Sequence, residues 1–234
     1  ARAAGRPWVS LALAPPVAVL GLWAVLATLA SWDVRDSAQY TVFYLAMGVA
    51  WLLPVTALLP LLGLHPRDDI LDRANAAAGW VTAGAIAGSM AAFAGGNIGD
   101  GPGWWCVVFA AGLAQGAWLA AWGALELLAR PTEHTTIDRD PAAALRLAGF
   151  LVAAGLVAGR GAAGDWVTAV DTVVDFASAW PLLPMVVVAA GVERAFGPSP
   201  ARPTGDPLLG GAVAIAYVAL AGLVVGALGS PSGT

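Results

Sequence analysis

The heptapeptide DRANAAA at residues 72–78 returns as DRDPAAA at residues 138–144. The pair Asp140-Pro141 then returns, at the same spacing, as Asp206-Pro207. A period of roughly 66 residues is longer than the units of the common soluble solenoids, and it matches two membrane-spanning helices joined by a turn. The repeated unit is therefore predicted to be a helical hairpin.

The composition indicates a membrane protein. Apolar residues make up 59% of it and charged residues 11%, against about 45–50% and about 25% in soluble globular domains. So little polar surface cannot cover a particle that faces water on all sides. Seven apolar runs are each near the ~17–25 residues that a helix needs to cross a bilayer. They cover residues 8–30, 40–64, 76–94, 104–125, 141–159, 167–192 and 207–228.

The predicted fold is therefore an all-α integral membrane protein with seven transmembrane helices. One leading helix in residues 1–38 precedes three hairpin repeats, and together they form a single membrane domain. A secretory signal peptide is the alternative for the first run, but its 23 residues exceed the usual ~7–15-residue apolar core of such signals. The three repeats are placed at residues 39–102, 103–166 and 167–234.

The arginines predict the orientation, because the chain contains no lysine. Arg35 and Arg160 fall on one side of the seven-span arrangement, and the other nine arginines fall on the opposite side. The positive-inside rule assigns the larger set to the cytoplasm, with the amino terminus inside and the carboxyl terminus outside. Exclusive use of arginine, with abundant Ala and Gly, suggests a GC-rich bacterial genome and hence an inner membrane. The cytoplasmic set is Arg2, Arg6, Arg67, Arg73, Arg130, Arg139, Arg146, Arg194 and Arg202.

The start of the third apolar run resembles a known family. Asn75 is followed by the alanines of residues 76–78 and then by Gly84 and Gly88. This order is similar to that of the YjfL-like family of small bacterial inner-membrane proteins. Members of that family are built from two helical hairpins, and the second helix of each opens with Asn and a run of small residues before two spaced glycines.

The second copy of the pattern extends the resemblance. The alanines of residues 142–144, followed by Gly149 and Gly155, are similar to the second half of the family, although Pro141 stands where its second Asn is expected. The resemblance covers residues 40–161 and implies a pair of hairpins. Because the family has no settled activity, the resemblance implies a fold and no function.

The residues of these motifs have simple structural roles. Asn75, Asp140 and Asp206 directly precede apolar runs, so they are predicted to cap helices by accepting unpaired backbone N–H groups. Pro at the next position, present after the two aspartates, suits the first turn of a helix. Glycines spaced four apart let helix backbones approach closely, so they predict tight packing within the chain or between subunits. These glycines are Gly84, Gly88, Gly112, Gly116, Gly155, Gly159, Gly222 and Gly226.

Acidic residues in the sixth run are the first functional candidates. Asp171 and Asp175 are four residues apart and so share one helix face. A carboxylate at the centre of a bilayer costs about 2.5–3.5 kcal/mol or more, and such groups usually face water, a partner or an ion path. Together with Gln115 of the fourth run they predict an ion path. The alternative is that residues 165–175 form an interfacial helix, which leaves residues 176–192 as the span.

A second candidate site lies in two cytoplasmic turns. Clusters of oxygen ligands suit Ca²⁺ or Mg²⁺, and added imidazoles suit a transition metal. The interleaved arginines favour the alternative of salt bridges in a solvated turn, and arginines beside helix amino termini could instead attract an anion. The candidate ligands are His65, Asp68, Asp69 and Asp72 in one turn and Glu133, His134, Asp138 and Asp140 in the next.

Several functional classes are disfavoured. The chain has no GxSxG, P-loop, HExxH or CxxC pattern and only two histidines, so it is not predicted to be an enzyme. A net charge of −4 argues against binding to nucleic acid. The prediction is a polytopic protein of the bacterial inner membrane that forms a small-ion channel or transporter and packs as a homo-oligomer. The alternative is a non-transporting subunit or scaffold whose charged cytoplasmic turns dock a cytoplasmic or membrane protein.

Overall fold

Seven long helices make up most of the computed structural model, which describes residues 8–201 and 203–229. Each has the length and apolar composition needed to cross a membrane, so the predicted all-α membrane fold is confirmed. Arg2, Arg6 and Arg202 lie outside the described residues. The spans are α1 (Trp8–Thr28), α3 with its 3₁₀ extension (Ala38–Leu62), α4 (Ala76–Gly95), α5 (Trp104–Ala129), α7 (Pro141–Ala162), the sixth span (Ala169–Phe196) and α10 (Pro207–Ala227).

Shorter elements complete the chain. The sixth span consists of α8 (Ala169–Phe176), a 3₁₀ turn η3 (Ala177–Ala179) and α9 (Leu182–Phe196). Pro181 directly precedes α9 and Pro184 lies in its first turn, where the missing N–H of proline is tolerated. The connections hold α2 (Trp32–Arg35), the 3₁₀ turn η1 (Leu59–Leu62), a π-helical turn η2 (Arg67–Asp72) and α6 (Pro131–Thr136).

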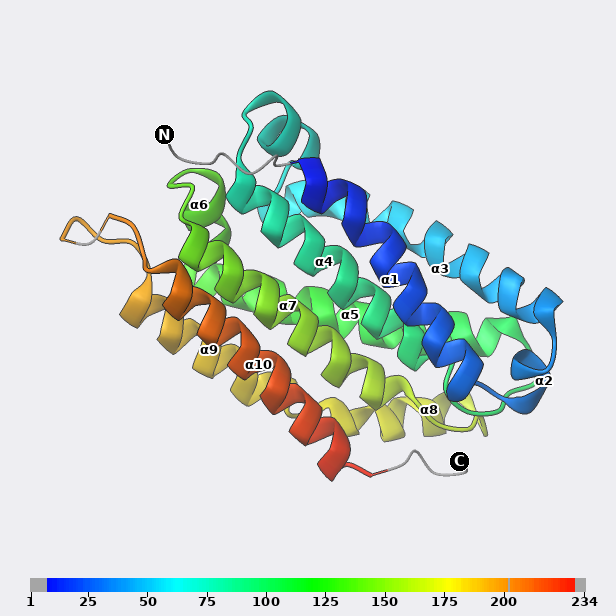
Figure 1. The fold of residues 1–234 in the computed structure, drawn as a ribbon. Helices are drawn as coiled ribbons and strands as arrows, with labels where there is room; N and C mark the ends of the chain where they lie inside the picture. The colour runs from blue at the N-terminus through cyan, green and yellow to red at the C-terminus, as the bar shows by residue number, and fades with distance from the viewer. Residues whose placement is uncertain (1–7, 202, 230–234) are drawn as a thin grey trace.

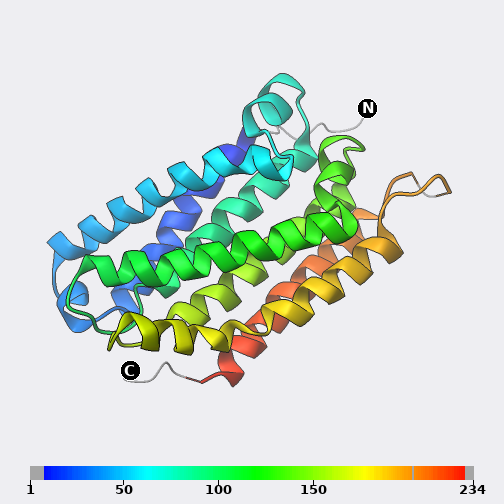
Figure 2. The same ribbon diagram turned by 180° about the vertical axis from the view of Figure 1, so that it is seen from behind.

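The long helices form two layers. In Figure 1 the row α1, α4, α7 and α10 lies in front, and in Figure 2 the row α3, α5 and α9 faces the viewer. Within the first row α4 packs against α1 and α7, and α7 packs against α10. Each predicted hairpin has its first long helix (α3, α5 or α9) in one layer and its second (α4, α7 or α10) in the other. About three quarters of α4 and α7 are buried (72% and 78%), against 17% of α1, α3 and α10.

Glycines set the close approach of α4 and α7. A Cβ atom built on Gly84 would lie 2.6 Å from the Cα of Ala148, and one on Gly155 would lie 2.1 Å from the carbonyl oxygen of Gly88. Gly159 approaches the backbone of Ala91 in the same way. Helix packing through Gly84, Gly88, Gly155 and Gly159 is therefore confirmed within the chain.

The other four predicted glycines do not pack within this chain. A Cβ atom on any of them would meet nothing within 4 Å. These positions are exposed on α5 and α10, so of the two predicted alternatives only contact between subunits is left for them, and it stays a prediction. They are Gly112 and Gly116 on α5 and Gly222 and Gly226 on α10.

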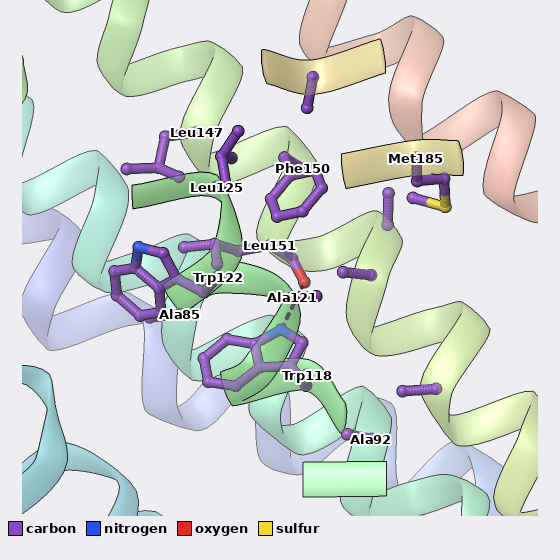
Figure 3. Close-up of a cluster of buried hydrophobic side chains, with 14 of the residues drawn as sticks. Ala85, Ala92, Trp118, Ala121, Trp122, Leu125, Leu147, Phe150, Leu151 and Met185 are labelled. Atoms are coloured by element: carbon purple, nitrogen blue, oxygen red, sulfur yellow. Dashed lines mark hydrogen bonds between the residues drawn. The ribbon is translucent and has the colours of Figure 1, made fainter. Parts of the chain in front are cut away.

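Two tryptophans fill the centre of the bundle. Trp118 and Trp122 of α5 are fully buried, and their rings meet edge to face with centroids 5.5 Å apart. The indole nitrogen of Trp118 donates a hydrogen bond of 2.8 Å to the carbonyl oxygen of Leu151 on α7, as Figure 3 shows. A buried indole N–H needs such a partner. Side chains rather than a channel occupy this part of the interior.

The turns before α4 and α7 share one backbone conformation. Ala74 and Arg139 each directly precede the capping residue of their helix, and both have positive φ angles, of 52° and 54°. The amide of Asn75 donates to the carbonyl of Asp69, and the amide of Asp140 donates to that of His134, each over 2.9 Å. The same local hydrogen bond therefore recurs in two of the predicted hairpins, with Asp140 rather than Pro141 in the place of Asn75.

The predicted helix caps are confirmed. The side-chain oxygen of Asn75 accepts from the amides of Ala77 and Ala78 at 3.0 and 3.4 Å. Asp206 accepts from the amide of Leu208. Asp140 caps α7 and also accepts from the amide of Gly205, at 3.0 Å. It thereby ties the start of α7 to the chain before α10.

Asp140→Ala should lower the free energy of unfolding by about 2 kcal/mol, because it removes a cap and leaves buried backbone N–H groups unpaired. The exposed cap Asp206 is the matched control, and Asp206→Ala should cost about 0.5–1 kcal/mol. Unfolding in detergent, followed by circular dichroism, would give both values. Equal losses would show that the bond to Gly205 contributes nothing.

Candidate functional site

A pocket of about 500 Å³ lies at the end of the bundle where α1, α4 and α7 terminate. Residues of α3 and α5 line it, and along α5 the lining extends as far as Ala110. Its remaining walls come from the connections at residues 30–34, 96–103 and 161–166 and from α8. We call it the acidic pocket. The opposite end of the bundle is called the arginine end, and it holds the connections before α4, α7 and α10.

Two glycines let the loops around the pocket lie close together. Gly99 and Gly164 have φ angles of +111° and +150°, which L side chains rarely adopt. A Cβ atom on Gly99 would lie 2.4 Å from the carbonyl oxygen of Gly164. The amide of Trp166 donates to the carbonyl of Asp100 over 2.7 Å, and Ala30 pairs with Gly99 in an isolated bridge. The three connections are therefore joined through their backbones.

Carboxylates dominate the polar lining of the pocket. Asp33, Asp100, Asp165 and Asp175 all line it, and none of them forms a salt bridge with an arginine or histidine of the described residues. Asp165 accepts from the backbone amide of Asp100 at 2.7 Å. Of the two arginines at this end of the bundle, Arg160 donates to the carbonyls at positions 228 and 229, and Arg35 is exposed and forms no salt bridge among the described residues. The pocket therefore carries unneutralised negative charge.

Aromatic rings form another part of the lining. Tyr40, Phe43 and Tyr44 reach it from α3, and Trp104 reaches it from the first position of α5. Trp166 also lines the pocket and packs edge to face on Trp105 and Phe109 outside it, with centroids 4.7 and 5.4 Å apart. Aromatic rings offer negative faces that attract cations.

Asn97 contributes a buried polar atom to the same pocket. Its side chain follows α4, is 5% exposed and donates from Nδ2 to the carbonyl of Phe93 at 3.0 Å. Its Oδ1 atom is buried and has no hydrogen-bond partner among the described residues. Because buried oxygen acceptors in proteins are almost always paired, this atom marks a position for a donor or a cation.

Helix ends add little net charge at the pocket. The carboxyl ends of α1, α4 and α7 meet here, and so do the amino ends of α3 and α5. Partial charges of about −0.5 and +0.5 on such ends largely offset one another. The ionised side chains therefore decide the sign of the potential, and it is negative.

The predicted ion-path residues occupy different places. Asp175 lines the acidic pocket. Asp171 is exposed on α8, where its side chain accepts from the hydroxyl of Thr168 at 2.7 Å, and it is not among the pocket's lining residues. Gln115 lies deeper in the bundle, about 7.5 Å along α5 from Ala110 at about 1.5 Å per residue. The structure therefore does not bring the three side chains together.

Gln115 forms a polar cluster inside the bundle. Its Oε1 atom accepts from the hydroxyl of Ser89 on α4 at 2.9 Å and from the indole nitrogen of Trp51 on α3 at 3.3 Å. Its Nε2 atom is buried without a partner among the described residues. Gln115 thus joins α3, α4 and α5 through hydrogen bonds. Its unpaired Nε2 group lies further along α5 towards the centre of the bundle than the acidic pocket.

The predicted metal site at the arginine end is not formed. Among the residues the structure describes, no group of three or more His, Cys, Asp or Glu side chains could hold a metal ion. The side chains have other partners, which is the physical reason. Asp69 accepts from the amide of His65 and from Arg73, Glu133 pairs with Arg130, His134 pairs with Asp138, and Asp140 caps α7, while Asp68 and Asp72 are exposed.

A buried ion pair was not predicted from the sequence. Arg146 of α7 donates from Nε and Nη2 to the two carboxylate oxygens of Glu193 on α9, over 2.8 and 2.7 Å. Both side chains are almost fully buried, with exposed fractions of 1% and 3%. Arg146 therefore lies inside the bundle and not in one of the connections that hold most of the other arginines. The available signal was the position of Arg146 inside an apolar run, with Glu193 directly after the end of another.

Comparison with known proteins adds no relative: no family model, no curated protein and no solved structure matches the chain. The resemblance to the YjfL-like family stays a prediction based on residues 40–161. The functional argument depends on the geometry of the chain itself.

Proposed function

We propose that this chain is a multi-pass protein of a bacterial plasma membrane that transports a small cation, with the acidic pocket as the outer binding site. The observation that carries the proposal is a set of four carboxylates without a salt-bridge partner among the described residues, Asp33, Asp100, Asp165 and Asp175, around a pocket that also holds the unpaired Oδ1 of Asn97. A cavity with one sign of charge and low-dielectric walls concentrates counter-ions and raises their rate of arrival.

The interior favours a transporter over an open pore. Below the acidic pocket, Gln115 offers one further polar position. Beyond it, Trp118 and Trp122 are fully buried between α5 and α7 and close the route. Transport would therefore require the helices around these tryptophans to move, as alternating access does.

Orientation and assembly complete the proposal. The positive-inside rule puts the arginine end in the cytoplasm, so the acidic pocket opens to the outside. Gly112 and Gly116 expose a flat stripe on α5 that no other part of the described chain covers. Small residues of this kind allow close helix contacts between subunits, and we include a homo-oligomer in the proposal.

Cation flux into liposomes tests the proposed function. Asp175→Asn should reduce the initial rate of potassium or ammonium uptake by about tenfold at low ionic strength, because it removes charge that concentrates the cation. Glu133→Gln at the arginine end removes the same charge far from the pocket and should leave the rate unchanged. Equal rates for the native protein and Asp175→Asn, or no flux above that of empty liposomes, would contradict the proposal.

The scaffold function remains the second candidate because of a shallow hollow at the arginine end. This hollow, of about 420 Å³, is lined by residues that include Arg130, His134 and Arg194. A basic hollow of this kind would suit an acidic segment of a partner protein. Crosslinking in native membranes from a photoreactive residue at position 130 should then give one stoichiometric adduct, and its absence would remove this candidate.

A further inference from the structure

We propose that the ligand of the acidic pocket is an organic ammonium ion that carries apolar substituents and at least one N–H group. This inference rests on the proposed cation transport and names the class of cation. Three features of the pocket lead to it: its size with its aromatic wall, the separation of its carboxylates, and the unpaired oxygen of Asn97.

The size and the aromatic wall favour an organic ion over a bare metal ion. Sites for small organic molecules typically have volumes of about 300–1,000 Å³, and the acidic pocket has about 500 Å³. Its lining includes Tyr40, Phe43, Tyr44 and Trp104. Rings attract ammonium groups through their faces and contact attached methyl or methylene groups through dispersion. A small metal ion would contact little of this apolar wall.

The carboxylates are arranged to attract charge at long range rather than to chelate. They come from four different segments of the chain, and the described residues contain no group of three acidic or imidazole side chains close enough for a metal ion. Ca²⁺ and Mg²⁺ need six or more oxygen ligands at about 2.0–2.6 Å, or several retained waters. An ammonium ion needs only a negative field and one or two acceptors.

Asn97 is the reason why the ligand should carry an N–H group. Its Oδ1 atom is an acceptor without a donor, on a side chain that is 5% exposed and lines the pocket. The Nδ2 group is held by the carbonyl of Phe93, which fixes the direction of the amide. A protonated amine can donate to this oxygen, and a quaternary ammonium ion cannot. The site should therefore distinguish these two classes of cation.

Calorimetric titration of the full chain in detergent tests the inference. Trimethylammonium, with one N–H group, should bind about 3–10-fold more tightly than tetramethylammonium, the difference expected for one hydrogen bond. Potassium chloride at the same concentration should bind more weakly than trimethylammonium and should leave most of the bound trimethylammonium in place.

Variants locate the binding on named residues. Asp100→Asn combined with Asp175→Asn should weaken trimethylammonium binding by at least about tenfold, and Trp104→Leu should weaken it about 2–5-fold. Asn97→Ala should remove the preference for trimethylammonium over tetramethylammonium. This ratio is measured within one protein sample, so a partial loss of folded protein does not affect it. Glu133→Gln should match the native protein throughout.

The outcomes separate this inference from the proposed function. Potassium flux that depends on Asp175, without trimethylammonium binding, would overturn the organic ligand and leave cation transport standing. Binding with the expected preference, without flux of any cation, would support the ligand and overturn transport. Equal binding of trimethylammonium, tetramethylammonium and potassium would show a diffuse negative surface and would overturn the inference.

Discussion

Replacing Glu193 by Ala should lower the free energy of unfolding by about 3–5 kcal/mol. The substitution leaves Arg146 charged and almost fully buried, without the carboxylate that accepts its two hydrogen bonds. Removing one partner of a buried pair is strongly destabilising because the remaining charge is not solvated. Denaturant titration in detergent, followed by tryptophan fluorescence, would measure the loss.

A double variant separates the cost of an unpaired charge from the value of the pair. Arg146→Met combined with Glu193→Leu should recover most of the stability, because apolar residues of similar volume often replace buried pairs at little cost. Glu133→Ala breaks the exposed pair with Arg130 and should change stability by less than about 0.5 kcal/mol. A double variant as unstable as Glu193→Ala would show that the pair itself stabilises the fold.

Gly155→Leu should produce the other large effect, a loss of about 3 kcal/mol or more. A Cβ atom at this position would lie 2.1 Å from the carbonyl oxygen of Gly88, so α4 and α7 would have to separate. These two helices are the most buried in the bundle, and overpacking in a close-packed interior typically costs about 1–3 kcal/mol for a smaller insertion than a full side chain.

Gly112→Leu is the matched control because nothing lies within 4 Å of its Cβ position. Its free energy of unfolding should stay within about 1 kcal/mol of that of the native chain, the difference in helix propensity between Gly and other residues. The mass of the particle in detergent should be measured alongside, since Gly112 lies on the stripe proposed to join subunits. Equal destabilisation by both variants would contradict the assignment of α4–α7 as the tightly packed pair.

The sequence predicted the helices well because the constraint on them is local. A bilayer requires an apolar run of a fixed length, and in the third run, residues 76–94, the predicted and observed ends differ by one residue. Helix caps are local as well, since Asn75 and Asp206 bond to amides two or three residues away. These features need only the neighbouring sequence.

Contacts between helices were predicted less well. Gly155 and Gly112 belong to the same spacing pattern, yet one meets a backbone and the other meets open surface. The spacing pattern predicts that a close approach of two helices is possible. Only the rotation of the helices relative to one another decides which glycine lies at such a contact. Asp171 and Asp175 lie on one face of α8, about one turn apart along its axis, and only Asp175 lines the pocket.

The sequence by itself determined that this chain has seven helices able to span a membrane, the bounds of these spans to within about four residues, and the caps of α4, α7 and α10. The tertiary structure decided which polar groups meet: it paired Arg146 with Glu193 across 47 residues and brought carboxylates from four separate segments to the acidic pocket. The physical reason is that burial in lipid and backbone hydrogen bonding act along one helix. Pairing of charges and closure of a pocket depend on distances between helices, which no single segment encodes.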